Sequence, residues 1–109
     1  MIFDHELKWD TLSIQKSICD HLEKLSWNIK NSMGFDDSGK SAFIIEARKK
    51  KFALIIYLEN DEKQIRIKAG IEGKYLPKGK QIPKYSKIFA HLELIQASKY
   101  FEKILEEMK

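Results

Sequence analysis

The sequence predicts a small α+β domain with a mostly antiparallel sheet of four or five strands and one helix at each end of the chain, in the order α-β-β-β-β-β-α. Two observations predict this class. Residues 41–69 contain three stretches rich in β-branched and aromatic residues, separated by short charged turns, which is typical of an antiparallel meander. Near both ends of the chain, apolar residues recur at helical spacing. A length of 109 residues is that of one domain, so we expect residues 1–109 to fold together.

The first predicted element is a helix over residues 11–25. Asp10 is suited to cap its first turn, because a carboxylate at that position accepts backbone N–H bonds. Leu7 falls on the same apolar stripe, so a start near Asp4 also fits the pattern. The stripe has helical spacing and consists of Ile14, Ile18, Leu22 and Leu25.

Two strands follow this helix. Residues 27–33 alternate with a period of two and predict the first strand, which leads into a glycine-containing loop at 34–40. Residues 41–47 are rich in β-branched and aromatic residues and predict the second strand. The charged residues 48–51 then form a tight turn.

The next two strands complete the meander. Residues 52–58 are apolar on both faces, which suits a central strand covered on both sides. A turn at 59–63 leads to a fourth strand at 64–69. Its alternation directs two isoleucines inward and Arg66 and Lys68 outward.

The C-terminal part begins with a long connection, residues 70–87, which contains three glycines and both prolines. Loops of this length in compact domains are usually functional or disordered. Residues 88–108 lack proline and glycine, so one long helix is an alternative there, but their apolar residues centre on two opposite sides of such a helix. A fifth strand over 88–95 and a helix from Ser98, with Ser98 as its N-cap, removes this conflict and is the arrangement we expect.

The inward positions of these elements predict the hydrophobic core. It comprises Ile14, Ile18, Leu22, Leu25, Trp27, Ile29, Phe43, Ile45, Leu54, Ile56, Ile65, Ile67, Leu92, Phe101, Ile104 and Leu105.

Composition restricts the class of protein further. The chain is 43% hydrophobic and 33% charged, which favours a folded body over disorder. The single cysteine, Cys19, cannot form an internal disulfide or a four-thiolate zinc site, and its expected role is a small apolar residue beside the first helix's core. The N-terminus lacks a secretory pattern, and the longest apolar run, at 52–58, is far shorter than the roughly 20 residues of a membrane span. We therefore expect a cytoplasmic protein without a membrane partner.

Motifs for catalysis or cofactor binding are sparse. The three histidines are not spaced as metal ligands with each other or with Cys19. No glycine-rich phosphate loop is present. We predict no metal, no cofactor and no catalytic residue.

One stretch resembles a nuclease motif. In FDDSGKSAFIIEARKK, Asp36 and Asp37 precede a strand that ends in Glu46, Ala47 and Arg48. This resembles the metal-dependent PD-(D/E)xK nucleases, in which an Asp and a Glu bind Mg²⁺ and a lysine two positions later helps to activate water. The lysine position holds Arg48, which stays protonated and cannot act as a base. The resemblance implies a divergent metal-dependent nuclease as a third functional hypothesis.

Charge is distributed unevenly along the chain, whose net charge is +4. Residues 48–92 hold twelve Lys and Arg against four Asp and Glu, a local charge of +8, whereas 1–47 and 93–109 carry −3 and −1. Lysines bind phosphate oxygens and tyrosine rings stack on unpaired bases. A solvated lysine-rich loop has the same composition, so the pattern leaves both interpretations open. The candidate nucleic-acid-binding residues are Lys49, Lys50, Lys51, Arg66, Lys68, Lys74, Tyr75, Lys78, Lys80, Lys84, Tyr85 and Lys87.

The leading interpretation is a non-catalytic binding module for nucleic acid or another polyanion. The alternative is a protein-interaction module, such as an inhibitor, an immunity protein or a chaperone, that pairs with a partner or a second copy through a sheet edge. Trp9 lies off the apolar stripe of the first helix and is the candidate partner-binding residue, whereas Trp27 alternates with Ile29 and is expected in the core.

Overall fold

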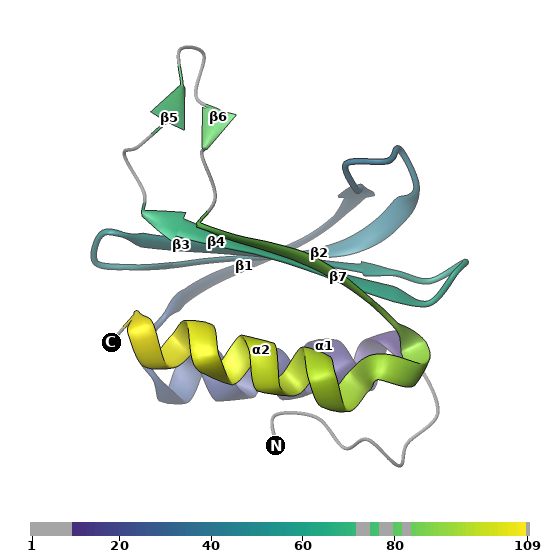
Figure 1. The fold of residues 1–109 in the computed structure, drawn as a ribbon, viewed down its shortest axis with the longest axis horizontal. Coiled ribbons are helices and arrows are strands. Elements are labelled where there is room, and N and C mark those ends of the chain that lie inside the picture. The colour runs from purple at the N-terminus through teal and green to yellow at the C-terminus, as the bar shows by residue number, and fades with distance from the viewer. Residues whose placement is uncertain (1–9, 72–74, 77–79, 82–83, 109) are drawn as a thin grey trace.

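The computed structural model describes residues 10–71, 75–76, 80–81 and 84–108. Its order of elements confirms the predicted α+β class, with an antiparallel sheet and one helix near each end of the chain (Figure 1). In chain order the elements are α1 (Thr11–Lys24), β1 (Asn28–Phe35), β2 (Ser41–Lys49), β3 (Phe52–Glu59), β4 (Gln64–Ile71), β5 (Tyr75–Leu76), β6 (Lys80–Gln81), β7 (Tyr85–Ala90), a 3₁₀ turn (His91–Glu93) and α2 (Leu94–Glu107).

The main sheet has five antiparallel strands in the order β1-β2-β3-β4-β7, which confirms the central position expected for β3. Both helices cover the same face of this sheet, as Figure 1 shows. On that face Leu54, Ile56 and Leu58 of β3 are fully buried. No helix of the described residues covers the opposite face, which we call the open face, and there Ile55 and Tyr57 are half-buried. The expectation that β3 is covered on both sides is therefore wrong for the middle of the open face, because both amphipathic helices pack on one side.

Helix α1 begins at the later of the two starts that the pattern allowed. The Asp10 carboxylate accepts hydrogen bonds from the backbone N–H groups of Leu12 and Ser13, so it caps the first turn. At the other end the chain turns at Ser26, whose φ of 66° is left-handed. Leu25 is the C-cap and is 37% exposed, so its predicted place in the core is wrong.

The hairpin turns are shorter than predicted because the strands extend further. Arg48 and Lys49 belong to β2, and only Lys50 and Lys51 form the turn to β3. Lys50 adopts a left-handed φ of 54°, which allows so tight a reversal. Glu59 likewise continues β3.

The C-terminal boundaries differ from the prediction, although a strand followed by a helix is present. The connection predicted at 70–87 contains the end of β4, the short β5–β6 hairpin and the start of β7. Helix α2 begins at Leu94, so Ser98 is a buried helical residue rather than an N-cap. Leu92 lies in the 3₁₀ turn and is 84% exposed, so its predicted burial is wrong.

The reason is that β7 ends five residues earlier than expected. The 3₁₀ turn separates the strand from the helix, so the helical period is counted only from Leu94. From that residue onward the apolar side chains share one stripe that contacts the sheet. Apart from Leu25 and Leu92, the predicted core residues are buried or pack against the core. The buried cluster also includes residues that were not predicted, among them Phe89, Leu94, Ala97 and Met108.

Candidate functional site

The open face is the surface on which outward side chains of the meander come together. Strand register places these side chains in rows across the sheet. The two central rows are Lys30–Glu46–Ile55–Lys68–Ser86 and Ser32–Ile44–Tyr57–Arg66–Ile88. The open face therefore combines cationic, acidic and apolar groups around one tyrosine.

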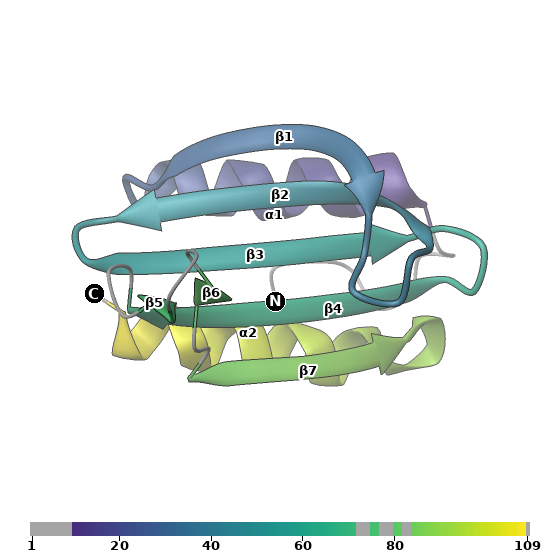
Figure 2. The ribbon, with the colours of Figure 1, turned by 90° about the horizontal axis from the view of Figure 1, so that it is seen from above.

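Two hairpins stand above the open face at its opposite ends. The β5–β6 hairpin rises from the end where β4 finishes (Figure 1). At the other end the loop between β1 and β2 bends over the sheet and reaches toward β4, as seen from above in Figure 2. The face between them is thus bordered at both ends by chain segments.

The β1–β2 loop brings Asp37 onto β4. Its Oδ2 atom lies 2.9 Å from Nζ of Lys68 and 3.5 Å from Nη1 of Arg66. The two cationic side chains are 27% and 21% exposed, so they are partly shielded from water, whereas the Asp37 side chain is 42% exposed. Arg66 and Lys68 point outward as predicted, but an internal carboxylate meets them there.

Asp36, the neighbouring acid, has a different role. Its Oδ1 atom accepts hydrogen bonds from the hydroxyl and backbone N–H of Ser38 and from the backbone N–H of Lys40. The hydrogen bond from the Ser38 hydroxyl is the main reason that the pKa of Asp36 lies below its usual value. Gly39 completes the turn with a φ of 84°, a conformation that favours glycine. Asp36 therefore shapes the loop that carries Asp37.

Tyr57 lies opposite Arg66 on the neighbouring strand of the open face. Burial raises its pKa, and the negative charges of Asp37 and Glu46 add to the effect. A tyrosine hydroxyl is protonated at neutral pH, so this group can donate a hydrogen bond on the open face.

One end of the open face, which we call the basic end, carries the exposed turn residues Lys50 and Lys51. The pairing of β3 with β4 determines what lies next to this turn. Phe52 pairs with Ile71, so the Lys50–Lys51 turn adjoins the point where the chain leaves β4 for β5. The described parts of the 74–87 segment follow at this end of the sheet: β5 and β6 come after Ile71 in the chain, and Tyr85 of β7 pairs with Ala69 of β4. Of the candidate residues in that segment, Lys74 and Lys78 lie outside the described residues, and Tyr75 and Lys80 belong to β5 and β6.

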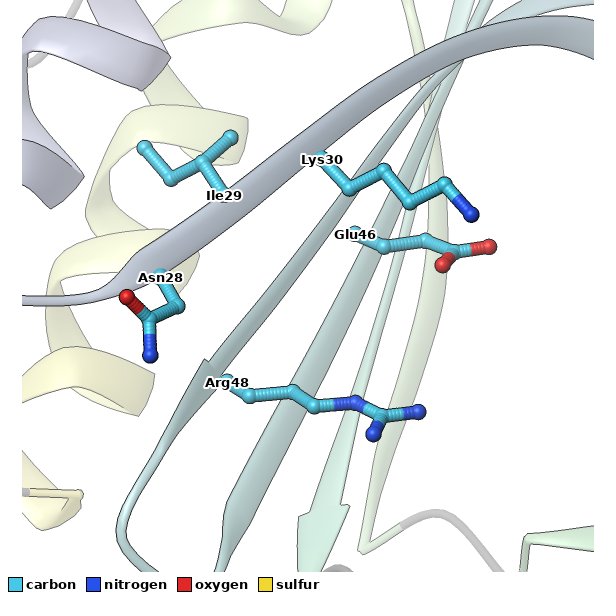
Figure 3. A pocket seen from close by; sticks show the side chains of 5 residues that line it. All are labelled: Asn28, Ile29, Lys30, Glu46 and Arg48. Carbon is cyan, nitrogen blue, oxygen red and sulfur yellow. The ribbon is translucent and has the colours of Figure 1, made fainter.

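A hollow of about 340 Å³ lies at the outer part of the open face, across β1 and β2. It is lined by Asn28, Ile29, Lys30, Glu46 and Arg48. Figure 3 shows Lys30, Glu46 and Arg48 projecting to the same side of the sheet. Sequence reasoning did not include Lys30 or Arg48 among the binding residues. The alternation within each strand predicts that these side chains point outward. The sequence does not reveal the register between β1 and β2, which brings them together.

Four other candidates lie on the helix side of the sheet or at its margin. Lys84 pairs with Glu107 of α2 at 3.1 Å, and the Tyr85 hydroxyl donates to the same carboxylate. Lys87 lies over the rings of Phe89 and Tyr100, at 5.3 and 5.6 Å from their centroids. Lys49 lines a hollow formed mainly by the ends of α1 and α2. For Tyr85 and Lys87 the sequence held a signal, because their alternation with Phe89 puts the three residues on one face of β7.

The acidic residues of the nuclease-like motif either contact other groups or lie apart from one another. Asp36 is bound within its own loop and Asp37 contacts Arg66 and Lys68, while Glu46 projects from the middle of β2. Within the part of the chain that the structure describes, no three His, Cys, Asp or Glu side chains are grouped so that they could hold a metal ion. Cys19 is a buried residue of α1 and belongs to the core, as predicted, and burial raises the pKa of its thiol.

The tryptophans differ in what the structure says of them. Trp27 is buried, as predicted, whereas Trp9 lies outside the described residues.

Neither α1 nor α2, the α-helices of the described residues, has the length and apolar content needed to cross a membrane. Comparisons of the chain with protein-family models, with curated proteins and with solved structures found no match.

Proposed function

We propose that this protein is a non-catalytic binding module for nucleic acid or another polyanion, and that it binds at the basic end of the open face. The observation that supports the proposal is the pairing of Phe52 with Ile71. Through this pair the Lys50–Lys51 turn lies beside Ile71, the last residue of β4. In the sequence, β4 is followed by the lysine-rich segment that contains Lys74, Lys78 and Lys80, and we propose that these lysines add to the same binding surface.

The physical basis is electrostatic. Lys50 and Lys51 are exposed in the turn. Arg48 of β2, which pairs with Ala53 of β3, projects from the open face close to this turn. Phosphate groups that contact several lysines release condensed counterions, so affinity falls steeply as salt rises. Contacts of this kind bind the backbone of a nucleic acid without reading its sequence.

The test is the binding of a labelled single-stranded oligonucleotide, measured by fluorescence anisotropy at several salt concentrations. We expect Lys50→Glu with Lys51→Glu to weaken binding at least tenfold and to reduce its salt dependence, because the variant places repulsive charges at the proposed contact. The control is Lys16→Glu with Lys99→Glu, which makes the same change in net charge at exposed positions of α1 and α2. Equal losses in both variants would show a general charge effect and would contradict a site at the basic end.

A second candidate function has its own observation. Met33 and Phe35 of β1, an edge strand of the main sheet, are 73% and 69% exposed. Large exposed apolar side chains on an edge strand favour a protein partner or a second copy of the chain. Light scattering at high salt over a range of concentrations tests for self-association. If the wild type associates and Met33→Lys with Phe35→Lys stays monomeric, this function is supported, and a wild type that is monomeric throughout contradicts self-association.

A further inference from the structure

We propose that Arg66 and Lys68 form an anion-binding subsite for a phosphate group in the middle of the open face, and that Asp37 occupies this subsite as an internal competitor. For the identity of its ligand, a nucleic-acid phosphate, the inference rests on the proposed function. It adds a second contact point and a regulatory group that the basic end by itself does not contain.

The geometry of the cations carries the first step. Arg66 and Lys68 are two residues apart on β4, so their side chains project from the same face. Both reach one oxygen, Oδ2 of Asp37. A guanidinium and an ammonium that converge on one anionic oxygen can make the same contacts with an oxygen of a phosphate group.

The surroundings fit a nucleotide better than a bare ion. Tyr57 is directly opposite Arg66, and Ile55 is directly opposite Lys68, on β3. Ile88 of β7 flanks Arg66 on the other side and is 44% exposed. A protonated tyrosine and apolar side chains beside a pair of cations give a base or sugar a surface to lie on while its phosphate is held.

The loop presents Asp37 without depending on its contact with β4. The hydrogen bonds of Asp36 close the turn, and Lys40 forms an ion pair with Glu62 of the β3–β4 turn. The loop is therefore anchored by neighbours on both sides of Asp37. Because none of these contacts involves the Asp37 side chain, they can persist when Asp37 leaves the subsite.

The expected size of the effect follows from exposure. Ion pairs of partly exposed side chains are weak, so Asp37 lowers the affinity for phosphate moderately and does not abolish binding. A phosphate of a nucleic-acid backbone carries one negative charge, as a carboxylate does, so its charge alone does not displace Asp37. The contacts of the attached base or sugar with Tyr57 and Ile88 supply the additional binding free energy that favours the ligand. Removal of the Asp37 charge should strengthen binding by roughly two- to tenfold.

The test uses pyrophosphate as the probe and follows backbone and side-chain NMR shifts of the full chain. We expect Asp37→Asn, which keeps the size and an oxygen of the side chain, to bind pyrophosphate roughly two- to tenfold more tightly than the wild type, with shifts at Arg66 and Lys68. Asp61→Asn removes the same charge from the exposed β3–β4 turn and should change affinity less than twofold. Arg66→Gln with Lys68→Gln in the Asp37→Asn background should abolish the tighter pyrophosphate binding.

Equal pyrophosphate affinities of wild type and Asp37→Asn would overturn the proposal, and so would shifts confined to other residues. The oligonucleotide measurement separates this outcome from failure of the proposed function. If Lys50→Glu with Lys51→Glu weakens oligonucleotide binding while Asp37→Asn equals the wild type, the basic end is supported and the internal competitor is contradicted. If Asp37→Asn binds pyrophosphate more tightly but no variant binds the oligonucleotide, the subsite is supported and the proposed function is contradicted.

Discussion

The hydroxyl group of Tyr85 donates a hydrogen bond to the carboxylate of Glu107, which joins the first residue of β7 to the last residue of α2. The same carboxylate accepts from Nζ of Lys84. The two ends of the C-terminal strand–helix unit are thus tied together on the helix side of the sheet. Two of the residues predicted to bind nucleic acid have an intramolecular partner in this arrangement.

The Tyr85–Glu107 bond predicts a stability contribution that depends on pH. It raises the pKa of Tyr85 to about 12 and, together with Lys84, holds the pKa of Glu107 below its usual value. The carboxylate contribution is present above the unfolded-state pKa of Glu107 and is lost as pH falls through its lower folded-state value. The tyrosine contribution is present below the unfolded-state pKa of Tyr85 and is lost as pH rises toward 12.

Chemical denaturation of wild type and Tyr85→Phe over a range of pH checks this prediction. We expect the difference in unfolding midpoint to be largest near neutral pH and to shrink below about pH 4 and above about pH 10. A difference that is constant over the whole range would show that the bond does not contribute through ionisation.

Two leucines that are close in the sequence, Leu92 and Leu94, test where the C-terminal helix begins. Leu94→Ala removes a buried side chain and should cost about 2–5 kcal/mol of unfolding free energy, because it leaves a cavity beneath α2. Leu92→Ala removes an exposed side chain from the 3₁₀ turn and should change the unfolding free energy by less than about 0.5 kcal/mol. Urea unfolding measures both, and a larger loss at Leu92 would favour the strand first predicted over 88–95.

Glu59 is a buried acid that stabilises a turn. Its two carboxylate oxygens accept hydrogen bonds of 2.8 Å from the backbone N–H groups of Asp61 and Glu62. Glu59→Ala leaves these donors without that partner and should destabilise the protein by about 1–3 kcal/mol. Glu59→Gln keeps one acceptor oxygen and should lose less, and Asp61→Ala, in the same turn, serves as the control in urea unfolding. If all three variants lose the same amount, the hydrogen bonds are not the cause.

Cys19 should be chemically inert in the folded protein. Burial raises the pKa of its thiol, so less of the reactive thiolate is present at neutral pH, and the side chain is enclosed by the core. Alkylation followed by mass spectrometry should show slow modification under native conditions and fast modification in denaturant. Fast modification of the native protein would contradict the burial of this residue.

Local patterns of the sequence determined the elements and most of the core. The stripe of Ile14, Ile18 and Leu22 predicted α1 together with its cap at Asp10, and the alternation around Ile65 and Ile67 predicted which face of β4 is buried. These features depend on residues a few positions apart, whose directions follow from the helical period and the strand period. The boundary between β7 and α2 was misplaced because the period changes at the 3₁₀ turn, and no glycine or proline marks that change.

The candidate site could be predicted only as a set of cations. The tertiary structure alone decided that Lys50 and Lys51 adjoin the end of β4, that Asp37 reaches Arg66 and Lys68, and that Lys87 faces the helix side. Each of these relationships joins residues from different strands or loops. The sequence by itself does not specify them, because they depend on the register between strands and on the side of the sheet that both helices cover.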